Sequence, residues 1–440
     1  MKKRKNEKFE NNEGQNQGGI RDNAAVFAKK IGDFFSTEPQ KEKVLSHEDF
    51  SAAGDVYYAG VSAYYKVAER ILLVLLVLFI VFSIITNSSE ITYNNFYYLL
   101  KDFTSAADAG NNTYETLSYE SDSRQRFVLY RGGIAAVSPS RLSIFTATGR
   151  RTLNETSSFS SPYAVSSNRY VLFYDTAGKS FSIYNSFSKV YSEELPNPVK
   201  CAALGTDGSF AIVTKAESGY WTTRIYTRSF DLKAIIPTSE YIFGLSLDSD
   251  GKKLAVLTYN EGIGIGRTKA SIYDLSKMKD SKGNKITLIK TLEYDGEFPI
   301  KCGFIDSGAF AMITDSRIRF FDKKLEETDS SDDYSDGSLR GYYLGDEGVA
   351  VAVIRNAGSA VYVFNGSGNA LMSDEFSQHI SDISVYDQYL FLQTEQGVMR
   401  VDCRNNTVET LNAGNGKMLV YNGKTALVCG ESKAEYLVFS

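Results

Sequence analysis

The chain of 440 residues is 43% hydrophobic and 23% charged, so most of it can bury a core. Its formal net charge is −5, and beyond residue 70 acidic side chains outnumber basic ones, which argues against nucleic acid as a partner. The 29 Tyr, 27 Phe and 35 Gly, set against seven Pro, favour strands and tight turns over helical bundles.

Residues 1–66 are predicted to form a cytoplasmic leader. Its opening tract, KKRKNEKFENNEGQNQGG, has too few apolar side chains to fold and is predicted to be disordered. Apolar residues then recur at helical spacing over residues 20–35, which predicts an amphipathic helix. Because basic residues flank its apolar face, this helix either lies along the inner leaflet of a membrane or docks on a protein.

Residues 67–89 are predicted to form a transmembrane helix. The stretch Ile71–Thr86 is uninterrupted apolar sequence, and about 20 such residues cross a bilayer core. The long leader and the lack of a cleavage site favour a retained signal anchor over a signal peptide. With the basic leader inside, the large domain is predicted to lie outside the cell membrane, on a single-pass protein.

A short juxtamembrane stalk helix is predicted for residues 90–110. In ITYNNFYYLLKDFTSAADAG the apolar residues Phe96, Leu99, Leu100 and Phe103 have helical spacing, and Gly110 is a stop signal. The stalk is expected to pack its apolar side on the domain that follows.

Residues 111–440 carry a repeat that predicts an all-β, eight-bladed β-propeller. Short strands ending in an apolar residue, an aromatic residue and a small polar residue recur at intervals of 39, 42, 47, 48, 43, 38 and 37 residues. A period near 40–45 residues with several short strands is typical of four-stranded propeller blades. The weakest member, RVDC around Val401, lacks the aromatic residue, and a seven-bladed ring is the fallback. The repeats are centred on Ile144, Ile183, Ile225, Ile272, Phe320, Val363, Val401 and Val438.

The end of the chain predicts how the ring closes. The eighth repeat stops after its third strand, and an open sheet edge would otherwise remain. The strand-like segment Thr113–Glu120 lies upstream of the first repeat and is predicted to supply the missing strand. The apolar runs Ala309–Ile313 and Val349–Ile354 are predicted to be inner strands buried between blades.

The four cysteines include no C-x-x-C pair, which argues against a zinc or redox motif. Cys201 and Cys302 lie in apolar runs and are predicted to be buried. A Cys403–Cys429 disulfide is the one pairing that an exported domain of this sequence would favour.

No catalytic, cofactor-binding or metal-binding residue is predicted, and the sequence does not point to particular ligand-binding residues. The propeller holds a single histidine, His379, so His-based triads and multi-His metal sites are excluded. GIGIG, from Gly262, lacks the strand–helix context of a dinucleotide site and is predicted to be a hairpin loop. The acidic run Glu326–Gly337 lacks the spacing of a calcium loop and is predicted to be a solvated connection between blades. One tryptophan, Trp221, is too few for the docking motif of quinone-dependent propeller dehydrogenases.

Taken over residues 65–440, the chain resembles a family of membrane-tethered β-propellers of Gram-positive bacteria whose function is unknown. The apolar stretch at Ile71–Thr86, the segment ITYNNFYYLLKDF and the series of blades carry the resemblance. It implies no activity and no site residues. The predicted function is a non-catalytic binding or scaffolding module at the cell surface, with a protein or cell-envelope partner on one propeller face. The alternative is a transmembrane sensor that couples ligand binding by the propeller to a cytoplasmic partner of the leader.

Overall fold

The computed structural model describes residues 64–65, 67–79, 81, 116–122, 124–216, 218–261, 264–276, 286–305, 308–356 and 358–440. Residues 64–65, 67–79 and 81 are helical. Within the described part of the chain, no helix combines the length and apolar character needed to cross a bilayer. The predicted amphipathic helix, the stalk helix and the second half of the predicted transmembrane helix lie outside the described residues.

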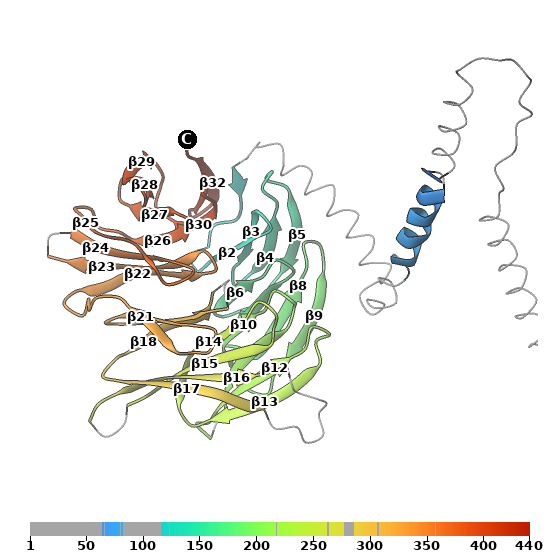
Figure 1. Ribbon diagram of the computed structural model, residues 1–440, viewed down its shortest axis with the longest axis horizontal. Coiled ribbons are helices and arrows are strands. Elements are labelled where there is room, and N and C mark those ends of the chain that lie inside the picture. Colours follow the sequence, from blue (N-terminus) through green and yellow to red (C-terminus); the bar gives the residue numbers. More distant parts are fainter. Residues whose placement is uncertain are drawn as a thin grey trace, which may run out of the picture. The chain divides into compact units, whose positions relative to one another are not determined.

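The rest of the described chain forms eight four-stranded antiparallel sheets, which follow one another around a ring (Figure 1). The first four blades have their strands in chain order from the inside of the ring outward. Their strands are β2 Arg126–Tyr130, β3 Gly133–Val137, β4 Arg141–Phe145 and β5 Arg151–Thr156; β6 Pro162–Ser166, β7 Val171–Asp175, β8 Ser180–Tyr184 and β9 Lys189–Glu194; β10 Val199–Leu204, β11 Phe210–Lys215, β12 Trp221–Tyr226 and β13 Leu232–Thr238; β14 Tyr241–Leu247, β15 Lys253–Asn260, β16 Arg267–Asp274 and β17 Thr287–Asp295.

Blades 5 to 7 repeat this order, and blade 8 takes its outermost strand from the beginning of the domain. Their strands are β18 Pro299–Phe304, β19 Phe310–Thr314, β20 Ile318–Phe321 and β21 Glu327–Ser330; β22 Ser338–Gly345, β23 Gly348–Arg355, β24 Gly358–Asn365 and β25 Ala370–Phe376; β26 Asp382–Tyr386, β27 Tyr389–Thr394, β28 Gly397–Asp402 and β29 Thr407–Leu411; β30 Lys417–Asn422, β31 Thr425–Cys429, β32 Lys433–Val438 and β1 Leu117–Ser118.

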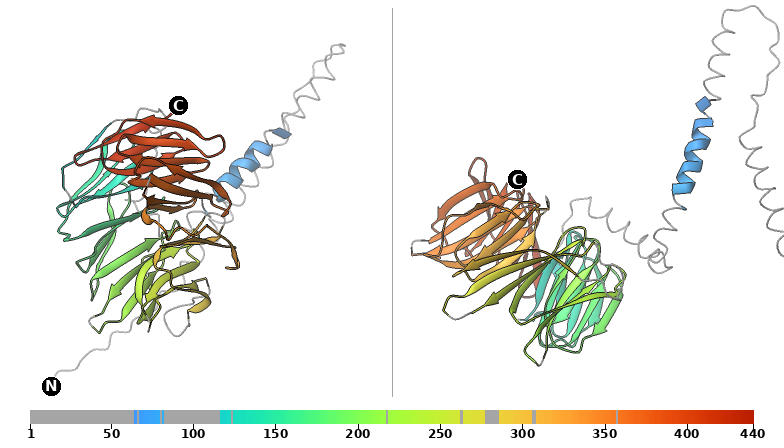
Figure 2. Two further views of the ribbon diagram at one scale, coloured as in Figure 1. Left: turned by 90° about the vertical axis from the view of Figure 1, so that its left-hand side faces the viewer. Right: turned by 60° about the horizontal axis from the view of Figure 1, so that its bottom comes forward.

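The ring is closed, and the eight-bladed prediction is confirmed. Each innermost strand contacts the innermost strand of the next blade, and β30 of blade 8 contacts β2 of blade 1. The two further views show the same succession of sheets from other sides (Figure 2). The closing strand is the predicted one: Leu117 and Ser118 pair with Ala434 and Lys433 of β32.

The repeated motif marks the third strand of every blade, and its aromatic residue coincides with a local irregularity. In blades 1 to 6 the register between the third and fourth strands shifts at the aromatic position, as between Ile144 and Phe145. Blade 7, whose motif has Asp402 in place of the aromatic, has no such shift. A bulge bends a strand and changes the direction of its side chain, so we infer that the bulge orients the aromatic residue.

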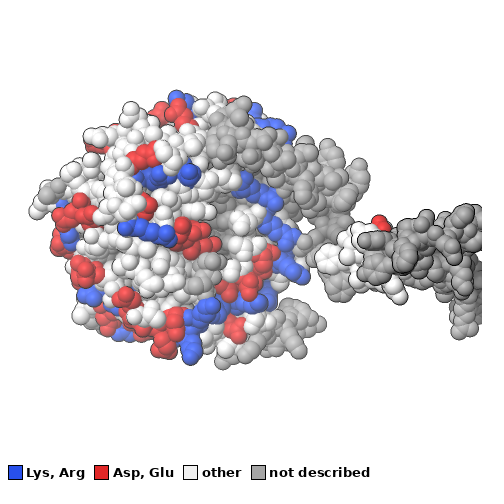
Figure 3. Space-filling model, turned by 45° about the horizontal axis from the view of Figure 1, so that its top comes forward, with Lys and Arg blue, Asp and Glu red and all other residues white. Residues whose placement is uncertain are grey.

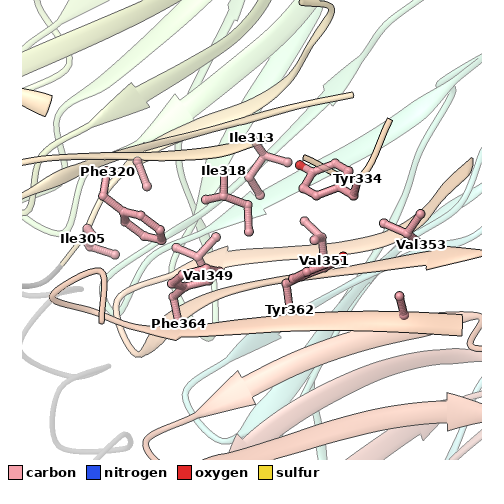
Figure 4. Close-up of a cluster of buried hydrophobic side chains, with 12 residues drawn as sticks. Ile305, Ile313, Ile318, Phe320, Tyr334, Val349, Val351, Val353, Tyr362 and Phe364 are labelled. Carbon is pink, nitrogen blue, oxygen red and sulfur yellow. The ribbon is translucent and has the colours of Figure 1, made fainter. Parts of the chain in front are cut away.

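The core lies between neighbouring blades, where the second strands are buried on both faces. All five residues of β19 and the first six of β23 are buried, as predicted for these apolar runs. Figure 4 shows the cluster that blades 5 and 6 share, in which side chains of both sheets interdigitate. Because alternate residues of a strand face opposite neighbours, each blade buries both faces and requires the next blade for stability.

Candidate functional site

The antiparallel order of each blade gives the ring two different ends. The turn end carries the hairpins between first and second strands. The loop end carries the connections between blades and the hairpins between second and third strands. Ligand sites are concave areas where a few side chains converge, and side chains gather at both ends of this ring.

Five aromatic side chains form a continuous series at the loop end of blades 3 to 5. Ring centroids of Trp221 and Tyr241 lie 4.7 Å apart, those of Tyr241 and Phe243 4.9 Å, and those of Phe243 and Phe298 5.0 Å. Tyr259 continues the series at 5.0 Å from Phe298. We call these five residues the aromatic row. Tyr241 and Phe298 are each 39% exposed, so the row presents apolar surface to solvent.

Two lysines border the aromatic row at its blade 3 end. The Lys215 ammonium lies 5.4 Å from the Trp221 ring centroid, and the Lys200 ammonium lies 5.3 Å from that of Tyr241. These are cation–π contacts. Neither lysine forms an ion pair with a described residue. Their charges are therefore available to a group of opposite charge.

The carboxylates beside the aromatic row are already engaged. Glu240 accepts hydrogen bonds from Lys269 Nζ at 3.0 Å and from Thr258 Oγ1 at 2.6 Å. Glu297 is paired with the guanidinium of Arg319. A third carboxylate, Asp315, accepts a hydrogen bond from the backbone N–H of Phe298 at 2.8 Å and forms no ion pair with a described residue. The charge at the blade 3 end of the row is positive, from Lys200 and Lys215. Elsewhere acidic and basic side chains alternate, as on the side of the propeller in Figure 3.

A polar cavity of about 520 Å³ opens at the turn end, at the mouth of the central channel. Seven of the eight blades contribute to its lining, mostly through the ends of their innermost strands. The lining residues are Leu129, Arg131, Gly132, Ser166, Ser167, Asn168, Leu204, Gly205, Thr206, Leu247, Asp248, Ser249, Phe304, Ile305, Asp346 and Tyr421.

Hydrogen bonds between neighbouring blades connect the hairpins around this mouth. Arg131 Nε donates to the carbonyl oxygen of Asn168 at 3.1 Å, from blade 1 to blade 2. Thr206 Oγ1 donates to the carbonyl oxygen of Ser249, from blade 3 to blade 4. The hairpin between β10 and β11 turns at Asp207 and Gly208, with Gly208 at φ +93°, a conformation that favours glycine.

The structure places the motifs that the sequence singled out apart from one another. His379 lies in the connection between blades 6 and 7. The GIGIG stretch falls within the hairpin between β15 and β16, as predicted, although Gly262 and Ile263 are outside the described residues. Among the described residues no group of His, Cys, Asp and Glu could hold a metal ion.

The acidic run Glu326–Gly337 is partly strand and partly the predicted connection. Glu327–Ser330 form β21, the outermost strand of blade 5. In the connection to blade 6, Asp333 pairs with Arg317 at 3.2 Å and Asp336 pairs with Arg355 at 3.0 Å. These carboxylates thus join neighbouring strands and connections by ion pairs.

All four cysteines are free, so the Cys403–Cys429 bridge that the sequence left open is not formed. Cys429 packs in the cluster between blades 8 and 1, whereas Cys403 packs against the cluster between blades 6 and 7. The two thiols belong to different inter-blade cores, which a pairing inferred from sequence could not reveal. The predicted burial of Cys302 is confirmed, and Cys201 is half-buried.

We expect the four thiols to react slowly with iodoacetamide at pH 8 in the native chain. Burial raises the pKa of Cys201 and Cys302 to about 12 and that of Cys403 to about 11, so the reactive thiolate is scarce. Mass spectrometry should find every cysteine labelled after unfolding in urea, and Cys403 labelled first under native conditions. A Cys403–Cys429 peptide in a non-reducing digest would contradict this expectation.

The family comparison matches residues 109–434, which is the whole propeller apart from its last strand residues. The chain belongs to DUF5711, a family of unknown function. The comparison with curated proteins gave no match. The membership confirms the resemblance to a propeller family without known activity and assigns no residue a role.

Solved structures similar to this DUF5711 chain include the following three. Sqt1 from Saccharomyces cerevisiae has a TM-score of 0.51 at 10% identity, over 75% of this chain and 99% of Sqt1. BamB from Moraxella catarrhalis has a TM-score of 0.48 at 12% identity, over 74% and 100% of the two chains. Dihydro-heme d1 dehydrogenase NirN has a TM-score of 0.46 at 12% identity, over 74% and 76%. Identities this low show the shared fold alone.

Sequence reasoning missed both the aromatic row and the cavity. One local signal could have pointed to the row: Glu240–Tyr241 and Glu297–Phe298 are glutamate–aromatic pairs at the entry to the innermost strands of consecutive blades. The cavity has no such signal, since its lining residues are of mixed type and come from seven separate blades.

Proposed function

We propose that this DUF5711 protein is a non-catalytic binding module that captures an acidic segment of a partner protein at the aromatic row. In this proposal residues 67–89 anchor the chain in the cell membrane, with the leader 1–66 in the cytoplasm and the propeller outside. The observation that carries the proposal is the exposed aromatic row, bordered by two lysines that form no ion pair with any described residue.

The composition of the row supports a protein partner. Trp and Tyr are enriched where proteins bind one another, and a few such residues supply most of the binding energy. Trp221 is anchored in the core and Tyr241 is half exposed, so a partner would meet a preformed surface. A preformed surface loses little conformational entropy on binding.

The charges support an acidic segment in particular. Lys200 and Lys215 attract carboxylates, while the engaged Glu240 and Glu297 repel little. A basic segment would leave both lysines facing like charge, which is unfavourable. In this proposal the two lysines select an acidic segment over a basic one, and the aromatic rings provide the contact area.

Trp221 provides the direct test, because it is the only tryptophan in the chain. We expect a synthetic peptide rich in Glu and Tyr to change the Trp221 fluorescence of the full-length protein in detergent, and salt to weaken the effect. Lys200→Glu combined with Lys215→Glu should weaken binding by about tenfold or more. The charge-matched control is Lys424→Glu, at the turn end, which should bind as the unaltered chain does.

Two results would overturn the proposal. One is that a control peptide with Lys in place of every Glu binds as tightly as the acidic peptide. The other is that Lys424→Glu weakens binding as much as the Lys200→Glu, Lys215→Glu double variant. The membrane part is tested separately with alkaline phosphatase fused to either terminus, where activity from the N-terminal fusion would reverse the proposed orientation. The sensor alternative requires a cytoplasmic partner that is lost when residues 1–66 are deleted and whose recovery depends on the propeller.

A further inference from the structure

The loop end of the central channel is rich in basic side chains. The eight innermost strands, all of them described, carry five basic residues, each within the first three positions of its strand and so at the loop end. The one carboxylate of these strands, Asp382, pairs with Lys417 at 2.7 Å. The other four basic residues are exposed and have no ion-pair partner among the described residues: Arg126, Lys200, Lys301 and Arg340. We call these four residues the basic rim.

Two lysines of the basic rim converge although they come from different blades. Burial raises the pKa of the Cys201 thiol to about 12, and the ammonium groups of Lys301 and Lys200 oppose this rise. A cation favours a thiolate in this way at short range, so both ammonium groups lie near Cys201. The innermost strand between them, β14, carries no charged residue. Positive charge from blades 3 and 5 is therefore concentrated on either side of blade 4.

The strand between these two lysines is open at Gly244. A Cβ added to Gly244 would meet no atom within 4 Å, and the backbone there is not left-handed. Neither packing nor backbone conformation thus requires a glycine at this position. We call the open space at Gly244, between the strands of Lys200 and Lys301, the notch. It has room for a bound group and positive charge on both sides.

The notch adjoins the aromatic row. Phe243, the neighbour of Gly244 in the chain, belongs to the row, and the Lys200 ammonium lies 5.3 Å from the ring centroid of Tyr241. At the blade 5 end of the row, the carboxylate of Asp315 lies beside Phe298. Asp315 follows β19, the second strand of its blade, and so stands farther from the channel than the innermost strands. A negatively charged segment on the row is therefore repelled by Asp315 and attracted toward the notch.

We propose that the acidic segment bound at the aromatic row continues into the mouth of the channel, where its carboxylates occupy the notch between Lys200 and Lys301. This inference rests on the proposed function, because the segment is the same one. It adds a direction: the segment runs inward from Lys215, at the end of the second strand of blade 3, to the basic rim. Arg126 and Arg340 then attract acidic residues that extend beyond the notch.

Binding of the peptide rich in Glu and Tyr to the full-length protein in detergent, followed by Trp221 fluorescence, tests this inference. Lys301→Glu reverses one of the two charges beside the notch, and Gly244→Glu places a carboxylate inside it. Each variant should weaken binding by about tenfold or more, because the carboxylates of the peptide then meet like charge.

Two controls separate charge in the notch from other effects. Gly244→Gln fills the notch with a side chain of similar size and no charge, so it should weaken binding much less than Gly244→Glu. Gly414, in the connection between blades 7 and 8, also has no atom within 4 Å of an added Cβ. Gly414→Glu therefore adds the same charge at another open position of the loop end, and it should bind the peptide as the unaltered chain does.

Failure of this inference can be told apart from failure of the proposed function. Unchanged binding by Lys301→Glu and Gly244→Glu, together with weakening by the Lys200→Glu, Lys215→Glu double variant, overturns this inference and leaves the proposed function standing. Weakening by Gly244→Gln or Gly414→Glu as large as that by Gly244→Glu overturns this inference too. If the unaltered chain does not bind the peptide, both fail. Circular dichroism checks folding, and should Gly244→Glu not fold, Lys301→Glu alone decides.

Discussion

Replacement of Leu117 by alanine is expected to lower the free energy of unfolding by about 2–5 kcal/mol, although Leu117 belongs to a strand of two residues. The side chain is fully buried. It packs between Ile134 and Phe145 of blade 1 and Leu427 and Cys429 of blade 8. The substitution leaves a cavity at the one place where the ends of the domain meet, so the cost includes both lost burial and weakened closure. Urea unfolding followed by far-UV circular dichroism measures it.

The matched control for this prediction is Val438→Ala on β32, the strand with which β1 pairs. Val438 is 56% exposed, so its truncation should change the free energy of unfolding by less than about 0.5 kcal/mol. If Leu117→Ala were no more destabilising than Val438→Ala, β1 would not contribute to the closed ring.

Replacement of Arg319 by methionine is also expected to be strongly destabilising, lowering the free energy of unfolding by about 3 kcal/mol. The guanidinium lies 3.9 Å from the centroid of the Tyr294 ring and pairs with Glu297 and Glu327. Burial by itself would lower its pKa, but the two carboxylates outweigh that effect and raise the pKa. Without Arg319, the largely buried Glu297 is left without its partner.

An exposed arginine with the same kind of partners serves as the control. Arg267 pairs with Asp295 at 2.6 Å and Glu293 at 3.2 Å, but its side chain is 51% exposed. Arg267→Met should therefore cost much less unfolding free energy than Arg319→Met, because solvent screens exposed ion pairs. Adding Glu297→Gln to Arg319→Met should recover part of the loss, because it removes the uncompensated charge. Equal losses for Arg319→Met and Arg267→Met would contradict the explanation.

The architecture could be predicted from sequence because the blades repeat a local physical pattern. In every blade except blade 7 the third strand has an apolar residue followed by an aromatic at its end, and that aromatic coincides with a bulge in blades 1 to 6. Even the weak repeat at Val401 is informative, since the blade without the aromatic is the blade without the bulge. Because the chain ends after the third strand of blade 8, the fourth strand of that blade had to come from upstream, and β1 supplies it.

The candidate sites could not be predicted in the same way, because each is assembled from several blades. The aromatic row brings Trp221 of blade 3 beside Tyr241 of blade 4 and Phe298 at the start of blade 5. Arg131 and Asp248 meet around one cavity although 116 positions separate them in the chain. Such contacts depend on the curvature of the ring, which sets how far one blade turns from the next. Whether Cys403 and Cys429 lie close enough to pair also depends on this curvature, so the sequence could not decide it.

The two-residue strand β1 has one more consequence. Among the described residues it is the first strand after the segment proposed to lie in the membrane, and two residue pairs join it to β32. A pulling force on that segment would act on the pairing of β1 with β32 before any other part of the ring. Blade 8 would yield there by peeling, while the other seven sheets, each drawn from contiguous sequence, stayed whole.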